Sequence, residues 1–163
     1  MDTIRFVVED YIDKESGFQF PTINIYINGR NLVDLVEQIE RGYRVPKEQG
    51  LPLGQSYVGL NPEYHRDFAG EFLARINRPR SVLLTCTCME ELCNSIIAKI
   101  TMDSETVTWS DIRNPFLGLE NTLWVNVEGS EDADGYPIDY SALGPFVFDR
   151  RQYVDAVNAL VVG

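Results

Sequence analysis

Alternation of apolar and polar side chains predicts two strands near the start of the chain. In TIRFVV, the residues Ile4, Phe6 and Val8 share one parity, and PTINIYINGR places isoleucines at positions 23, 25 and 27 on one side. We expect the first strand to stop at the acidic run EDYIDKESG, because carboxylates are poor strand residues. The second strand should end in a tight turn at Asn28-Gly29.

A helical period replaces the strand period in three other segments. NLVDLVEQIERGY carries apolar residues at positions 32, 35, 36 and 39, one stripe of a helix that we expect to end at Gly42. PEYHRDFAGEFLARI follows an Asn-Pro start and predicts a second helix, which Gly70 weakens. DRRQYVDAVNALVV predicts a third, with Asp149 and Gln152 in a capping box and positions 153, 157 and 160 buried.

Residues 82–112 are rich in Val, Ile and Thr and predict three consecutive antiparallel strands, with Trp109 in the core. Residues 43–61 lack periodicity and indicate a long loop. Strands and helices are mixed without repeated βαβ units. We therefore predict an α+β fold, in which two or three helices pack on one face of a mainly antiparallel sheet. The 163 residues form one globular domain, residues 1–163, on this interpretation.

The three cysteines, Cys86, Cys88 and Cys93, lie within eight positions of a predicted hairpin. Strand alternation puts the first two on one face, and a four-residue loop would set Cys93 opposite Cys88. The cluster allows a zinc site with His65 as fourth ligand, a disulfide, or a reactive thiol. Core packing is favoured over these, because free cysteine behaves as a small hydrophobe and the adjoining glutamates raise a thiol pKa.

Charge excludes some partners and favours others. Fourteen basic and twenty-five acidic residues give a formal charge of −11, which repels nucleic acid and anionic membranes and attracts basic proteins. No apolar run approaches the roughly 20 residues of a membrane span, and the first residues do not resemble a signal peptide, so we expect a cytoplasmic protein. An acidic loop, which we define by its carboxylates, offers a partner-binding surface: Glu128, Glu131, Asp132, Asp134 and Asp139.

Recognised catalytic patterns are missing from the sequence. The acidic loop fits a calcium-binding EF-hand poorly, since Ser130, Ile138 and Ser141 fall on ligand positions. His65 could act as a general base beside Asp67, but a lone histidine without a nucleophile motif is more typical of the surface. Phosphate-binding loops and metalloprotease or serine hydrolase motifs are absent from the chain. An enzyme is therefore the less favoured class, though it stays open.

The run LLTCTCMEELCNSIIAKITMDSETVTWSDIRNP, followed later by FVFDRRQYVDAV, resembles a family of uncharacterised bacterial proteins of unknown function. A Cys-x-Cys hairpin and a helix starting in F-x-F-D-x-x-x-Y carry the resemblance, as does the earlier INGRNLVDLVEQIE. The resemblance implies a fold of the kind predicted above and no activity. Met89 and Leu92 stand where that family has glycine in the hairpin.

Two functional hypotheses follow. The first is an acidic cytoplasmic protein that works as an immunity or inhibitor protein, covering a basic protein partner such as a toxin or nuclease through the acidic loop. The second, from another class, is a metal-binding or thiol-dependent protein centred on Cys86, Cys88 and Cys93. The sequence does not indicate an oligomeric state.

Overall fold

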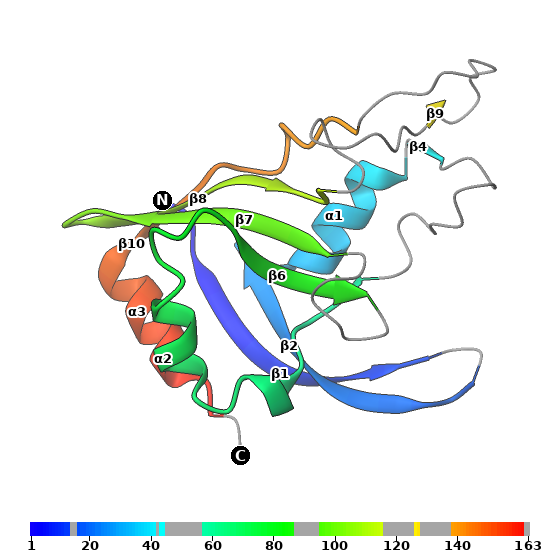
Figure 1. Ribbon diagram of the computed structural model, residues 1–163, viewed down its shortest axis with the longest axis horizontal. Helices are drawn as coiled ribbons and strands as arrows, with labels where there is room; N and C mark the ends of the chain where they lie inside the picture. Colours follow the sequence, from blue (N-terminus) through cyan, green and yellow to red (C-terminus); the bar gives the residue numbers. More distant parts are fainter. Residues whose placement is uncertain are drawn as a thin grey trace.

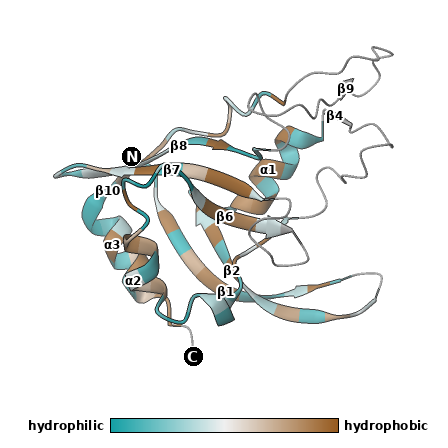
Figure 2. Cartoon of the chain, viewed as in Figure 1, coloured by the Kyte–Doolittle hydropathy of each residue, from teal (hydrophilic) through white to brown (hydrophobic). Residues whose placement is uncertain are grey.

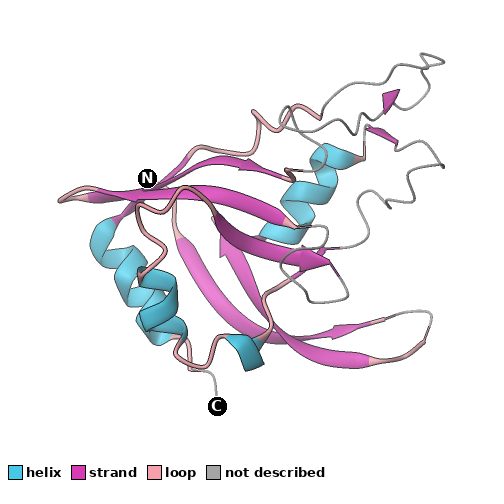
Figure 3. Cartoon of the chain, in the orientation of Figure 1, coloured by secondary structure: helices cyan, strands magenta, loops and turns pink. Residues whose placement is uncertain are grey.

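The computed structural model describes residues 1–13, 16–41, 43–44, 57–86, 95–115, 126–127 and 138–161. Its helices are α1 (Leu32–Glu40), α2 (Phe68–Leu73), α3 (Arg150–Ala159) and the 3-10 helix η2 (Pro62–Tyr64). Its strands are β1 (Ile4–Ile12), β2 (Gln19–Ile27), β3 (Arg30–Asn31), β4 (Tyr43–Arg44), β5 (Tyr57–Val58), β6 (Ser81–Cys86), β7 (Ile96–Met102), β8 (Thr106–Arg113), β9 (Asn126–Val127) and β10 (Phe146–Asp149). Figure 3 shows their arrangement and confirms the α+β class.

Antiparallel pairing organises these strands into two main sheets in the described residues. One sheet has the order β1-β2-β3 and the other β10-β8-β7-β6-β5, while β4 and β9 form a separate short pair. Two single-residue bridges join the main sheets, Asp2 with Phe148 and Ile23 with Leu60. The two sheets therefore form a curled wall around a common interior (Figure 1).

Local irregularities help to curl the five-stranded sheet. The β6–β7 register shifts between Val82 and Leu84, and the β7–β8 register shifts opposite Asp111, whose φ is 55°. Aspartate tolerates this left-handed backbone better than most residues, and a bulge bends the strand that carries it. The predicted three-strand meander is thus confirmed as β6, β7 and β8, with bends that the pattern did not indicate.

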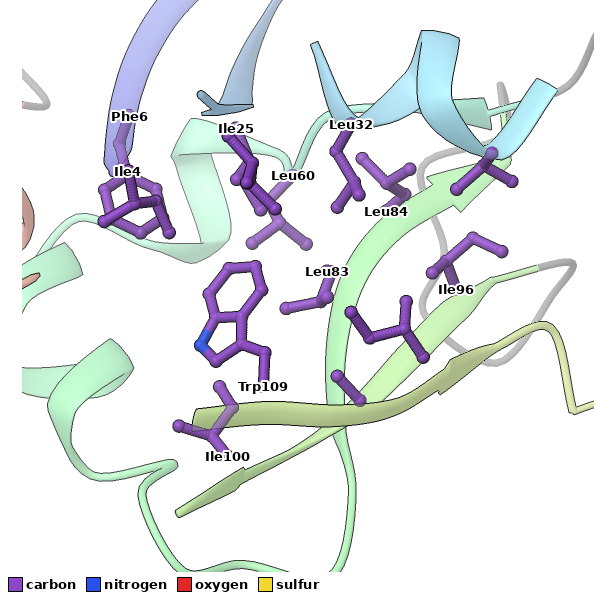
Figure 4. Close-up of a cluster of buried hydrophobic side chains, with 14 of the residues drawn as sticks. Ile4, Phe6, Ile25, Leu32, Leu60, Leu83, Leu84, Ile96, Ile100 and Trp109 are labelled. Carbon is purple, nitrogen blue, oxygen red and sulfur yellow. The ribbon is translucent and has the colours of Figure 1, made fainter. Parts of the chain in front are cut away.

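A cluster of aromatic side chains lies in the interior of the curled wall, among a larger number of aliphatic ones. Phe6 makes edge-to-face contacts with Phe68 and Phe72 at centroid distances of 5.1 Å, and Trp109 meets Phe72 at 6.2 Å. Tyr153 of α3 lies edge-to-face with Trp109 and accepts a hydrogen bond from its indole Nε1 at 3.1 Å. Figure 4 shows Trp109 with aliphatic side chains from both sheets around it. Trp109 is fully buried, as predicted.

The predicted helices are confirmed in part. Helix α1 covers most of the first helical segment, and Asn31 caps it by accepting from the Val33 amide. The second segment breaks into η2 and α2, because Asp67 starts a new helix by accepting from the Gly70 amide. Asp149 caps α3 as expected, accepting from the Gln152 amide at 3.0 Å.

The first strand is longer than predicted. β1 continues through the acidic run to Ile12 and pairs residue by residue with β2, as far as Ile12 opposite Gln19. The end of β1 and the start of β2 project from the rest of the fold, at the lower right of Figure 1. We call residues 8–13 and 16–22 the arm.

Candidate functional site

The arm carries an unusual share of the exposed apolar side chains. Among the described residues, six large hydrophobic side chains are exposed, and three of them, Val8, Ile12 and Phe18, lie on the arm. Their exposed fractions are 40%, 57% and 65%. Isolated exposed hydrophobics are common, whereas a group on one projecting element is typical of an interaction surface.

Strand alternation distributes these side chains over both faces of the arm. Val8 and Ile12 continue the parity of the buried Ile4 and Phe6, so they extend the core-facing side beyond the core. The opposite face has an aromatic row, in which Phe20 contacts Tyr11 at 5.2 Å and Phe18 at 5.7 Å between ring centroids. Figure 2 shows apolar positions continuing along the arm. The arm is therefore apolar on both faces.

Carboxylates lie between these apolar residues. Glu9 Oε1 accepts from the Tyr26 hydroxyl at 2.5 Å and from Asn24 Nδ2 at 3.0 Å. These two hydrogen bonds hold the pKa of Glu9 below its usual value, despite its partial burial, so Glu9 is ionised at neutral pH. Asp10 is exposed on the other face. The run EDYIDKE contains four acidic residues and one lysine, so the arm is acidic as well as apolar.

A second polar group lies deep in the protein, at the end of α1. Glu40 is fully buried, and its Oε2 accepts hydrogen bonds from Tyr57 at 2.7 Å and Tyr140 at 2.8 Å. The Tyr57 hydroxyl in turn accepts from Asn114 Nδ2 at 2.7 Å. Burial and the negative charge of Glu40 raise the pKa of both tyrosines well above the usual range. The hydroxyls therefore stay protonated and donate to the carboxylate.

This buried group fits a structural role better than a catalytic one. Its four residues come from α1, β5, the position directly after β8 and the segment before β10, so they connect segments distant in sequence. None of the four side chains is exposed to solvent beyond a small fraction, which leaves little access for a substrate. A buried carboxylate that is hydrogen-bonded by several side chains holds the segments carrying those side chains in fixed positions.

His65 is also buried, which makes the expected surface position wrong. Its Nδ1 donates to the Asn61 carbonyl at 3.1 Å, and its Nε2 accepts from Arg75 Nη2 at 2.9 Å. The Arg75 guanidinium also donates to the Val82 carbonyl and packs over the Phe72 ring at 5.0 Å. Both imidazole nitrogens are engaged, so service as a zinc ligand or general base would require breaking a hydrogen bond.

The remaining predicted site residues lie mostly outside the described part of the chain. Cys88 and Cys93 are outside it, and Cys86 is placed only as the last residue of β6. The zinc and thiol hypotheses therefore stay predictions. The described residues contain no group of three or more potential metal ligands. His65 is the one predicted ligand whose side chain is described.

The acidic loop is described only at Asp139, and Glu128, Glu131, Asp132 and Asp134 lie outside the described residues. Asp139 is exposed, and its Oδ1 accepts from the Ser141 amide at 2.9 Å. Hydrogen bonds from Ser141 lower the pKa of Asp139. The role of the loop in partner binding thus stays a prediction.

The arm and the Glu40 group were both missed by the sequence interpretation, although each leaves a signal. Apolar residues stand on both sides of the hairpin turn, Tyr11 and Ile12 before it and Phe18 and Phe20 after it, and Tyr11 faces Phe20 across the two strands. Glu40 follows Leu32 and Val36 at four-residue spacing, which places it on the buried stripe of its helix.

Comparisons with known proteins add no assignment. In the described part of the chain, no helix has the length and apolar character that crossing a membrane requires. No protein-family model, no curated protein and no solved structure matches this chain.

Proposed function

We propose that this chain is a cytoplasmic binding protein that covers a basic protein partner, in the manner of an immunity or inhibitor protein. The observation that carries the proposal is the arm, where Val8, Ile12 and Phe18 are exposed beside Glu9 and Asp10. Protein interfaces combine an apolar centre with a polar rim, and aromatic side chains contribute much of their binding energy. An acidic rim selects a basic partner.

The charge of the whole chain supports the same partner class. A formal charge of −11 on 163 residues attracts basic proteins over several ångströms and speeds their encounter. Such steering is screened by salt over a distance of about 10 Å at 0.1 M ionic strength. We therefore expect binding that weakens as salt is added, chiefly through slower association.

The first test identifies the partner and then measures it. Proteins captured on the immobilised chain at low salt are identified by mass spectrometry, and the strongest is purified and titrated by calorimetry at several salt concentrations. We expect a partner with an excess of Lys and Arg, and a dissociation constant that rises steeply with salt. Neutral or acidic partners, or affinity independent of salt, would contradict the proposal.

A second test locates the apolar part of the interface. Phe18→Ser removes an exposed aromatic ring from the arm, and we expect it to weaken binding by about tenfold or more, as loss of an interface anchor does. Val161→Ser is the matched control, because Val161 is 83% exposed but follows α3 and lies outside the arm. If the two variants bind the partner with equal affinity, the arm is not part of the interface.

The acidic loop is tested separately. Replacing its five carboxylates by Asn and Gln keeps side-chain size and removes five charges. If the loop contacts the partner, the affinity falls by more than an equal number of neutralised carboxylates elsewhere produces. If partner binding is unchanged, the loop is not part of the interface, and the assignment of Glu128, Glu131, Asp132, Asp134 and Asp139 is wrong.

A further inference from the structure

The outer edge of β1 is open along the arm. In an antiparallel pair, alternate residues direct both backbone polar groups toward the partner strand or away from it. The Gln152 side chain bonds both the amide and the carbonyl of Ile4 from outside the pair. The amide and carbonyl of Ile4 therefore point away from β2. Val8, Asp10 and Ile12 have the same parity, so their amides and carbonyls point outward too. Within the described part of the chain, no group bonds the outward amides and carbonyls of these three residues.

The outer edge of β2 is blocked at two of its three outward positions over the same length. Its outward residues opposite Val8, Asp10 and Ile12 are Ile23, Pro21 and Gln19. Ile23 already exchanges two backbone hydrogen bonds with Leu60, at 2.7 and 3.1 Å. Pro21 has no amide proton and is typical of an edge position that does not pair. The arm thus offers one edge to an added strand, and that edge belongs to β1.

Side chains along this edge specify the strand that fits. On the core-facing side, Val8 and Ile12 are apolar and exposed, with Asp10 between them. The other side presents Glu9, which is ionised, and the partly exposed Tyr11. A strand placed beside β1 therefore meets two apolar positions separated by a negative one, and a second carboxylate behind them. Complementary residues are apolar at the ends and basic in the middle.

A second copy of the chain fits this edge poorly. Full use of Val8 to Ile12 in a two-fold antiparallel pair would centre on Asp10, which would set two Asp10 carboxylates directly opposite each other. Each copy also carries a formal charge of −11. Charged residues on an exposed edge are a common means of preventing such self-pairing.

We propose that the outer edge of β1, from Val8 to Ile12, binds an extended basic segment of the partner as an additional β-strand. The inference rests on the proposed function and adds the mode of recognition. Backbone hydrogen bonds along an open edge supply affinity, and alternate side chains supply specificity. The bound segment is selected by its own side chains: a lysine or arginine that lies beside Asp10, and a β-branched residue that packs on Val8 or Ile12.

The peptide Val-Thr-Lys-Lys-Val, extended with Thr-Lys at each end and labelled with fluorescein, is the probe. We expect saturable binding by fluorescence anisotropy and none for the counterpart with glutamate in place of lysine. Two further peptides carry N-methyl groups on alternate residues. One peptide is methylated at the odd-numbered positions and the other at the even-numbered positions. Because only one set faces β1, one N-methylated peptide should bind at least about tenfold more weakly and the other normally. Equal affinities of the two, or no binding of the parent peptide, overturn strand addition.

Variants of the protein place the peptide on β1. Ile12→Pro removes an outward amide and no amide directed at β2, whereas Ile12→Thr loses similar apolar surface and keeps the amide. We expect the proline variant to bind the peptide several-fold more weakly than the threonine variant, with equal thermal stability showing that both fold. Hydrogen exchange in the wild-type protein should slow at Val8, Asp10 and Ile12 when the peptide is added. Protection at Gln19 instead places the strand on β2 and overturns the assignment.

These outcomes separate the inference from the function on which it rests. A purified basic partner that binds with strong salt dependence, equally to Ile12→Pro and Ile12→Thr, leaves the proposed function standing and removes strand addition. Absence of any basic partner, together with a wild-type dimer that Ile12→Pro dissociates in sedimentation measurements, removes both and makes a second copy the occupant of the edge.

Discussion

Replacing Tyr140 by phenylalanine should destabilise the protein by an amount that depends on pH. The Tyr140 hydroxyl donates to Glu40 Oε2 at 2.8 Å, and Glu40 is fully buried. Phenylalanine keeps the ring without the donor, so one hydrogen bond to a buried carboxylate is lost. Loss of one partner from a buried polar group costs about 1–3 kcal/mol. We expect the free energy of unfolding to fall by about 2 kcal/mol at pH 8.

The pH dependence follows from the pKa of Tyr140. Burial, then repulsion from the charges of Glu40 and Tyr57, raises this pKa far above its usual value near 10. Above pH 10 the unfolded chain releases the tyrosine proton while the folded protein keeps it, so stability contributed by the protonated hydroxyl is complete below pH 10 and lost above it. The loss amounts to about 1.4 kcal/mol between pH 9 and pH 11 for one tyrosine.

The Tyr140→Phe variant lacks this proton, so its difference from the wild type should narrow with pH. We expect a gap of about 2 kcal/mol at pH 8 and about 1.4 kcal/mol less at pH 11. Urea denaturation followed by tryptophan fluorescence at each pH measures the gap. Tyr64→Phe is the control, because its hydroxyl is exposed and the change should alter stability by less than about 0.5 kcal/mol throughout. A gap that stays constant to pH 11 would refute the coupling between Tyr140 and the buried carboxylate.

Three further substitutions test how the sheets and helices are joined. Gly59→Ala would press a methyl group on the Ile23 carbonyl, and we expect a loss of about 1–3 kcal/mol in urea denaturation, with faster amide exchange at Ile23. Gln152→Leu removes both hydrogen bonds to the Ile4 backbone and should cost about 1–3 kcal/mol in the same measurement. Phe72→Ala empties the centre of the aromatic core and should cost about 3–5 kcal/mol by the same assay; a loss below 1 kcal/mol would show that the core is packed differently.

Sequence periodicity predicted the elements whose burial is one-sided. The β2 isoleucines and the α1 stripe appear where their periods indicated, because a single buried face imposes its own period on the sequence. The β6–β8 meander was predicted from its Val, Ile and Thr content instead, and consecutive buried residues such as Leu83 and Leu84 leave it no alternation. The end of β1 was predicted wrongly. Beyond Val8 the strand has no core to face, so its pattern is set by pairing with β2 and not by burial.

Contacts between distant residues escaped prediction altogether. Glu40 meets Tyr57 and Tyr140, which lie 17 and 100 positions away along the chain. The position of Glu40 on an apolar stripe indicates that it is buried. The neighbouring sequence, however, does not indicate which side chains donate hydrogen bonds to its carboxylate. His65 is similar, since its partner Arg75 belongs to the chain after α2. A buried polar side chain is specified by its partners, and these come from the tertiary fold.

The capping box of α3 shows how a local motif can be diverted by tertiary structure. Asp149 caps the helix as the motif predicts, but the Gln152 side chain bonds the Ile4 backbone of β1. In a capping box, that side chain would return to the Asp149 amide. The edge of β1 at Ile4 is a stronger competitor, because its amide and carbonyl are partly buried and need partners.

The treatment of strand edges is what connects this fold to its proposed function. Near the core, three devices occupy edge positions: the Gln152 side chain on Ile4, the bridge from Leu60 to Ile23, and the bridge from Asp2 to Phe148. Along the arm, β2 is protected by Pro21, whereas β1 is protected only by the charge of Asp10 and its neighbours. Proline removes a backbone donor whatever strand approaches, whereas charge discriminates between strands by their own charge. We therefore expect the carboxylates on the β1 edge to disfavour other copies of this acidic chain and to accept a basic strand, which is the selectivity that a binding protein for a basic partner requires.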